Sequence, residues 1–150
     1  MAGAHPGYVI RLATAADIPA ITAMYRHDGL LHAQGDPERA EYSYASVRAA
    51  GGNVLVALEG AAVIGHLELL LCQEVLPLGR YGYLEALEVR VDRRRCGVGR
   101  ALVEAAKALT RAAGGERHRV PRRGRGGGTG PARDPGAAGA NAPLLSRCAA

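Results

Sequence analysis

Seven consecutive residues have the types and spacing to bind a phosphate group: Arg94, Arg95, Cys96, Gly97, Val98, Gly99 and Arg100. They lie between an apolar stretch with strand character and a helical pattern. Glycines let the backbone curve and let a ligand approach closely. The first turn of a helix presents N–H groups without helical partners, and the helix dipole adds positive charge there. The segment therefore predicts an anion site, suited to a pyrophosphate and built mainly from backbone N–H groups.

The pattern differs from two common phosphate loops. No GxxxxGK[ST] sequence is present, and Leu102 occupies the third glycine position of GxGxxG. With the preceding arginine the pattern becomes RxxGxG, filled by Arg94, Gly97 and Gly99. An isolated GxG more often only turns the chain. Three features of this segment favour phosphate binding instead: the strand before it, the helix after it and the arginine at position 94. For Arg93 and Arg95 a solvated cluster of charges is the expected role.

The elements that must position this loop follow from hydrophobic periodicity. Strands are predicted at residues 8–13, 53–58, 62–71 and 83–89, and helices from about 14, from 36 to about 50 and from about 100 to 113. The glycines from Gly79 to Gly82 are expected to break the chain. Alternation in the last strand places Glu85, Leu87 and Val89 on one face and Glu88 on the other. The order β-α-α-β-β-β-loop-α predicts an α/β (α+β) domain with mostly antiparallel strands.

Composition divides the chain into residues 1–115, the predicted domain, and residues 116–150, a tail rich in Gly, Pro, Arg and Ala. The first part holds 12 basic and 12 acidic residues, whereas the tail holds 7 basic and 2 acidic residues and so carries the whole net charge of +5. The tail is predicted to be disordered or irregular because it has too few large apolar residues to form a core. Residues 116–120 are a poor candidate for a buried strand. Two explanations stay open: a shifted reading frame, or a genuine tail that binds RNA or an acidic partner.

The strand–RxxGxG–helix segment resembles the acetyl-CoA-binding motif of the GNAT N-acetyltransferase superfamily. The resemblance covers about residues 8–115 and rests on matching residues before, in and after the loop: Leu84, Glu85, Leu87, Val89, Arg94, Gly97, Gly99, Leu102 and Val103. It departs from the family at Val91, Arg95 and Cys96. The resemblance implies a mixed, mostly antiparallel sheet flanked by helices.

The family's fold continues after this helix with further strands and a helix that often carries a tyrosine. The tail of this chain contains no aromatic residue. The C-terminal strands are therefore expected to be missing or irregular.

The resemblance also implies roles for individual residues. Acetyl-CoA would be the co-substrate, with its pyrophosphate on the N–H groups of residues 96–100 and with Arg94 and Arg95 nearby. Leu87 and Val89 would offer backbone groups to the pantetheine arm. Glu85 would be the general base that takes a proton from a primary amine, although a surface role is equally compatible with its position. Tyr25 and His27, near the end of the first helix, are candidate contacts to a small-molecule or peptide amine.

Other functions remain open at this stage. The chain could be a non-catalytic domain that binds coenzyme A, or it could bind nucleic acid through its basic tail, although the neutral charge of residues 1–115 argues against the second. His66, among apolar neighbours, is expected to be structural. No CxxC pair and no apolar run long enough to span a bilayer are present, so neither a metal site nor a membrane span is expected. A cytoplasmic setting is expected, and a sheet edge left by a missing strand would favour a homodimer.

Overall fold

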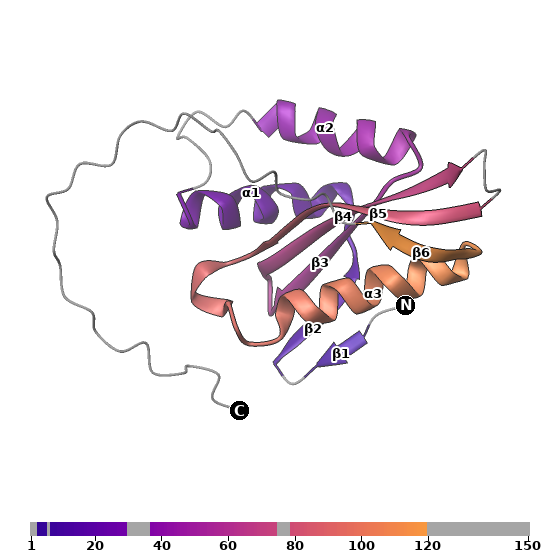
Figure 1. Cartoon of the computed structure of the whole chain (residues 1–150). Coiled ribbons are helices and arrows are strands. Elements are labelled where there is room, and N and C mark those ends of the chain that lie inside the picture. Colours follow the sequence, from indigo (N-terminus) through magenta and orange to yellow (C-terminus); the bar gives the residue numbers. More distant parts are fainter. Residues whose placement is uncertain (1–2, 6, 30–36, 75–78, 120–150) are drawn as a thin grey trace, which may run out of the picture.

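The computed structural model describes residues 3–5, 7–29, 37–74 and 79–119 of the 150-residue chain. They form one six-stranded sheet in the order β1-β2-β3-β4-β5-β6 (Figure 1). Its strands are β1 (Gly3–His5), β2 (Tyr8–Leu12), β3 (Asn53–Glu59), β4 (Ala62–Glu74), β5 (Gly79–Val89) and β6 (Gly115–Arg119). Neighbouring strands are antiparallel, except that β6 runs parallel to β5. The predicted mixed, mostly antiparallel sheet is confirmed.

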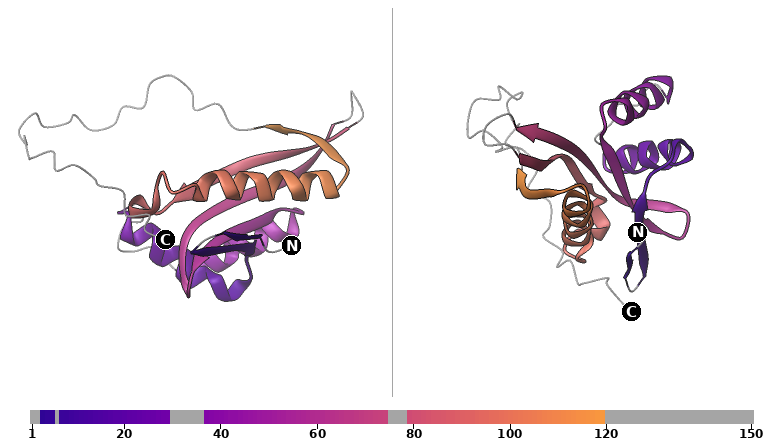
Figure 2. Two further views of the ribbon diagram at one scale, coloured as in Figure 1. Left: turned by 90° about the horizontal axis from the view of Figure 1, so that it is seen from below. Right: turned by 90° about the vertical axis from the view of Figure 1, so that its right-hand side faces the viewer.

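Helices cover both faces of the sheet. Figure 2 shows α1 (Ile18–His27) and α2 (Pro37–Ala49) on one face and α3 (Val98–Ala112) on the other. Each face has its own buried apolar cluster: Leu67, Leu69 and Leu102 belong to the α3 face, and Met24 and Val56 to the α1–α2 face. The predicted first residue of α2, Asp36, lies outside the described residues, and α2 ends at Ala49, before Gly51 turns the chain with a φ of +77°.

A capping box holds the start of α1 to the sheet. Thr14 donates its backbone N–H to Asp17 Oδ2 (2.7 Å), and Asp17 also accepts two hydrogen bonds from the guanidinium of Arg11 on β2 (2.7 and 2.8 Å). Asp17 is buried, and its bonds with Arg11 hold the pKa of its carboxyl well below the usual range. Thr14 and Asp17 therefore cap the short 3₁₀ helix η1 (Ala15–Asp17), which leads directly into α1.

The prediction that Gly79–Gly82 breaks the chain is wrong, because these residues are the first part of β5 and pair with residues 71–74 of β4. The glycine at 82 serves close packing instead. A Cβ built on Gly82 would lie only 2.3 Å from Thr110 Oγ1 of α3. A residue without a side chain therefore lets the helix lie directly on the strand.

The predicted alternation along β5 is also wrong beyond its middle, because a β-bulge interrupts the pairing with β4. Leu69 pairs with Leu84 and Leu67 pairs with Leu87, so Glu85 and Ala86 together face the single residue Glu68. An extra residue in one strand changes which face the following side chains occupy. Glu88 consequently pairs with His66, and shares the α1–α2 face with it.

The strand β6 was not predicted, and it crosses the boundary that composition placed after residue 115. Its pairing with β5 runs from Arg80–Gly115 to Tyr83–Arg119. Only Gly115 in it is buried, while Arg117 and Arg119 both pair with Glu74 at the end of β4. A hydrophobic pattern does not reveal this strand because backbone pairing and ion pairs, not apolar side chains, attach it to the sheet.

Candidate functional site

The phosphate loop, residues 94–100, leads from the end of β5 into α3 through two backbone bends of left-handed conformation. Arg95 has a φ of +65° and Gly97, the N-cap residue of α3, has a φ of +82°. Glycine adopts this conformation readily, whereas a non-glycine residue adopts it at a cost of about 1–2 kcal/mol. A strained arginine next to a glycine bend is an arrangement that often accompanies a ligand-binding loop.

The helix α3 begins two residues before the predicted position of about Arg100. Its first helical hydrogen bond runs from the N–H of Ala101 to the carbonyl of Gly97 (3.0 Å). The N–H groups of Val98, Gly99 and Arg100 therefore precede this bond and have no acceptor within the helix. The Val98 side chain is buried beneath the loop and fixes this helix end against the sheet. The result is a rigid N-terminus with donors directed away from the helix.

A hollow of about 380 Å³ lies at this helix end. Six residues line it, all of them predicted to bind the cofactor: Val89, Arg94, Arg95, Gly97, Gly99 and Arg100. Cys96 and Val98 belong to the same loop but do not line the hollow, and Leu87 lies further back on β5 with 41% of its surface exposed. The structure therefore brings the arginines and both glycines of the motif together.

The arginines near the loop divide into two groups. Arg93 is anchored to Glu59 at the end of β3 (2.6 Å) and to Asp92 (3.2 Å), so it holds the loop to the sheet. Arg94 donates from Nε to the Val89 carbonyl (3.0 Å), which fixes its guanidinium beside the hollow. Within the described residues Arg95 and Arg100 form no ion pair, and their charges remain available to an anion.

One edge of β5 is open next to the loop. The strand β6 pairs only with residues 80–83, so among the described residues nothing pairs with the β6-side edge of β5 from Leu84 to Val89. The bulge at Glu85 and Ala86 lies within this open stretch. Backbone N–H and carbonyl groups on an unpaired edge can bind an extended ligand as a further strand would. This is the edge on which Leu87 and Val89 were predicted to meet a pantetheine arm.

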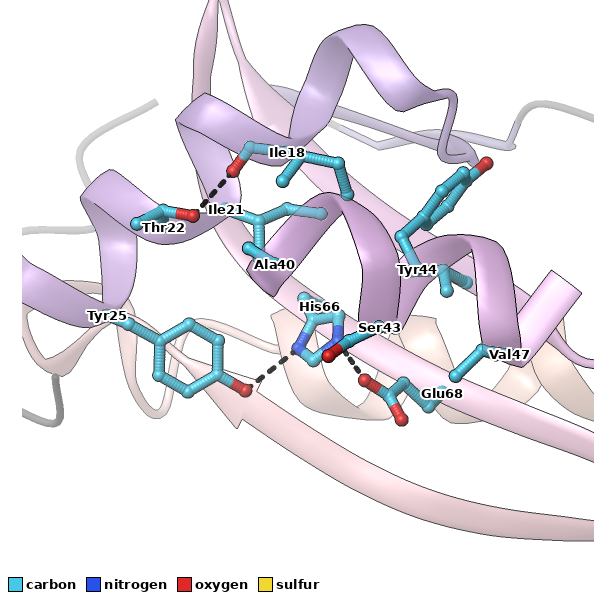
Figure 3. A pocket seen from close by; sticks show the side chains of 11 residues that line it. Ile18, Ile21, Thr22, Tyr25, Ala40, Ser43, Tyr44, Val47, His66 and Glu68 are labelled. Carbon is cyan, nitrogen blue, oxygen red and sulfur yellow. Dashed lines mark hydrogen bonds and ion pairs between the residues drawn. The ribbon is translucent and has the colours of Figure 1, made fainter. Parts of the chain in front are cut away.

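A second cavity, the α1–α2 pocket, lies on the other face of the sheet and holds about 250 Å³. Its walls are mainly apolar, and its polar end consists of Tyr25, His66 and Glu68 (Figure 3). The Tyr25 hydroxyl lies 3.2 Å from His66 Nδ1, and His66 Nε2 lies 3.3 Å from Glu68 Oε1. Burial raises the pKa of Tyr25 to about 12, and the charges of Glu88 and Glu68 add to this effect. The tyrosine is therefore protonated at neutral pH and can donate to the histidine.

The sequence interpretation missed the pairing of His66 with Glu68. Spacing of two in a strand places them on one face, which was the available signal. The prediction that His66 is structural fits its burial (3% exposed), yet the same side chain lines a cavity. Of the two predicted substrate contacts, Tyr25 lines this pocket and His27 does not.

His27 lies at the end of α1, close to the start of the phosphate loop. Its Nδ1 is 2.8 Å from Asp28 Oδ1, and the other oxygen of Asp28 accepts the backbone N–H of Val91 (2.9 Å). The carboxylate of Asp28 thus ties α1 to the segment that leads into the loop. Tyr25 and His27 are consequently separated, one inside the pocket and one beside the loop.

The predicted base Glu85 is exposed on the bulge, opposite Glu68. Glu88 lies on the α1–α2 face, 4.0 Å from Arg94 at its nearest ion-pair atoms. Across the described part of the chain, no cluster of three or more His, Cys, Asp and Glu side chains is placed to hold a metal ion. None of the helices in the described ranges combines the length and apolar character needed to cross a bilayer.

Comparisons with known proteins agree with this geometry. Residues 18–120 match the Acetyltransferase (GNAT) family. No curated protein matches the chain. Similar solved structures include an acetyltransferase of Trypanosoma brucei (17% identity, TM-score 0.66, covering 76% of this chain and 82% of that one). Glucosamine-6-phosphate N-acetyltransferase of Arabidopsis thaliana is 16% identical (TM-score 0.66, 76% and 81%), and a GNAT family acetyltransferase of Staphylococcus aureus is 12% identical (TM-score 0.68, 85% and 96%).

The structural matches are distant in sequence and establish the fold alone. The family match spans more than half of the chain and includes β5, the phosphate loop and α3. The chain therefore belongs to the GNAT acetyltransferase family.

Proposed function

We propose that this protein transfers the acetyl group of acetyl-CoA to a primary amine by direct attack of the amine. The observation that carries the proposal is the hollow at the N-terminus of α3, lined by Arg94, Arg95, Gly97, Gly99 and Arg100 beside an open edge of β5. Its donors fit a pyrophosphate, because they combine helix N–H groups with guanidinium groups. The open edge beside it fits an extended amide-containing arm.

In this proposal the backbone of residues 96–100 holds the pyrophosphate, with the side chains of Arg94, Arg95 and Arg100 around it. The backbone of Leu87 and Val89 binds the pantetheine arm, although the Val89 carbonyl already accepts a hydrogen bond from Arg94. Acetyl-CoA supplies an activated acetyl thioester: the amine nitrogen forms a bond to the acetyl carbon, the C–S bond breaks, and coenzyme A leaves as a thiolate that takes up a proton. The bound arm would then follow β5 from the loop to the bulge, which directs the acetyl group toward the residues around Glu85.

The chain must also remove a proton from the acceptor, because an alkylammonium with a pKa of about 10 is not nucleophilic. Glu85 is the proposed base, directly or through water. Its exposure leaves the carboxylate accessible, and the bulge places it opposite Glu68. Glu88 is the alternative base, because the bulge turns it to the face of His66 rather than to the opposite face that strict alternation predicts.

The test combines a coenzyme A titration by calorimetry with acetyl-CoA turnover on a panel of primary amines. Binding with turnover supports the proposal. Binding without turnover on any amine would support a non-catalytic coenzyme A-binding domain instead, and neither binding nor turnover would reject both functions. Removal of residues 120–150 should leave coenzyme A binding unchanged, whereas steeply salt-dependent RNA binding that disappears on the same truncation would favour the nucleic-acid alternative.

A further inference from the structure

The α1–α2 pocket has an apolar body and one polar end. Its body is formed by aliphatic side chains that include Ile18, Ile21, Val47 and Val54. The carboxylate of Glu68, 30% exposed, stands at the polar end with His66 (Figure 3). The pocket volume of about 250 Å³ exceeds that of an engineered apolar cavity of about 150 Å³ that binds benzene in another protein. A ligand that fills the pocket is therefore small and mostly apolar.

In the described part of the chain, the carboxylate of Glu68 contacts a histidine. His66 Nε2 lies 3.3 Å from Glu68 Oε1, and His66 Nδ1 lies 3.2 Å from the Tyr25 hydroxyl. Within the described residues no lysine or arginine forms an ion pair with Glu68. Glu88 adds a second negative charge on the same face, with Arg94 4.0 Å from it. The polar end of the pocket thus favours a cationic group.

We propose that the α1–α2 pocket binds the acceptor, and that the acceptor is a small primary amine with an apolar body whose ammonium group pairs with Glu68. This inference rests on the proposed acetyltransferase function and names its substrate class. Charge complementarity selects the ammonium, and the aliphatic walls select the body, because polar groups placed there would lose hydration without gaining hydrogen bonds. A polyamine or an amino sugar fits such walls poorly.

The position of Glu68 connects this pocket to the open edge of β5. Glu68 is the residue that faces the bulge formed by Glu85 and Ala86, and its neighbour His66 pairs with Glu88. Directly paired residues of adjacent strands lie about 5 Å apart. An ammonium at Glu68 would therefore lie one strand away from the proposed base Glu85.

The test measures binding of three probes to the full chain by calorimetry: 2-phenylethylamine, its neutral analogue 2-phenylethanol, and spermidine. The expected order is 2-phenylethylamine tightest, by about tenfold over the alcohol, because a charge-assisted hydrogen bond is lost in the neutral analogue. Glu68→Gln should remove this preference, whereas Glu104→Gln, on α3 and paired with Lys107, should keep it.

Two serines of α2 provide a matched pair of variants for the pocket body. Ser43 and Ser46 are both exposed, and each donates its hydroxyl to the carbonyl four residues earlier, but only Ser43 lines the pocket. Ser43→Leu should weaken 2-phenylethylamine binding about tenfold by filling the cavity, and Ser46→Leu should leave it unchanged. Thermal unfolding of each variant shows whether the fold is retained.

Equal binding of the amine and the alcohol, tighter binding of spermidine, or no binding of 2-phenylethylamine would each overturn the inference. The same is true if the two serine variants behave alike. A parallel coenzyme A titration separates this failure from failure of the proposed function. Coenzyme A binding without amine binding rejects the substrate class only, whereas the loss of both rejects the acetyltransferase proposal as well.

Discussion

The phosphate loop and the α1–α2 pocket are built in different ways. The loop is made of seven consecutive residues, and its donors are mainly backbone N–H groups oriented by two left-handed residues and a helix end. The pocket is made by side chains from α1, α2, β3 and β4, and its central hydrogen bond joins Tyr25 to His66, 41 positions apart. If the proposed roles hold, the difference teaches that the binding site for a common cofactor can be encoded in one short segment, whereas the acceptor site depends on tertiary packing.

The largest expected effect concerns the bulge, where the two sites meet. Glu85→Gln should lower kcat by about 100-fold with little change in coenzyme A affinity, because it removes the proposed general base but no proposed phosphate contact. Glu88→Gln should lower kcat less. Steady-state kinetics with a substrate amine, together with coenzyme A calorimetry, measure both. A larger loss for Glu88→Gln would transfer the role of base to Glu88.

A smaller effect is expected when the loop alone is changed. Gly97→Ala should weaken coenzyme A binding about tenfold, because a non-glycine residue at a φ of +82° is strained by about 1–2 kcal/mol. The effect is conformational, since a Cβ there would meet only the Tyr8 hydroxyl, at 3.9 Å. Amine binding in the α1–α2 pocket should not change.

Gly60→Ala is the control for this variant. Gly60 also has a positive φ (+60°) and open space around it, but it lies in the turn between β3 and β4. It should lose a similar amount of stability without any loss of coenzyme A affinity. If both variants weaken coenzyme A binding equally, the loop is not the binding site.

A substitution in the α1–α2 pocket should affect the pocket and leave the phosphate loop unchanged. Tyr25→Phe removes the hydroxyl that hydrogen-bonds to His66 Nδ1 and leaves a buried nitrogen without its partner, so the free energy of unfolding should fall by about 1–2 kcal/mol. Coenzyme A affinity should be unchanged. Chemical denaturation measures the first quantity and calorimetry the second. Tyr42→Phe is the control, because Tyr42 is 74% exposed and should have no effect on either.

The smallest expected effect is a dependence of stability on pH at the start of α1. The pKa of Asp17 is lowered in the folded state by its hydrogen bonds to Arg11. Its contribution to the free energy of unfolding is therefore complete above the unfolded pKa of about 4. This contribution is lost as the pH falls further, because the unfolded chain then binds the proton more readily than the folded protein. Denaturation between pH 7 and pH 3 should show this loss, and Asp17→Asn should flatten the profile. An unchanged profile would show that the pair does not contribute.

The geometry of the loop was predictable because the features that shape it are contained in one short segment. Arg94, Gly97 and Gly99 line one hollow in the structure, as the motif indicated. The strand β6 was missed because its attachment depends on backbone pairing and on Glu74, which no local pattern reveals. The faces of Glu85 and Glu88 were mispredicted because alternation assumes one residue opposite another, and the bulge places two opposite Glu68. Roles for individual residues in catalysis remain predictions.

The bulge in β5 has a consequence for how this strand tolerates insertions and deletions. Loss of one residue at Ala86 would remove the bulge and leave a single residue, Glu85, opposite Glu68. Leu87, Glu88 and Val89 would keep their partners and their faces, because the bulge holds one extra residue. A single-residue deletion between the bulge and the phosphate loop would instead exchange the surroundings of the side chains that follow it. The bulge is therefore the position in β5 at which the loss of one residue should be tolerated best.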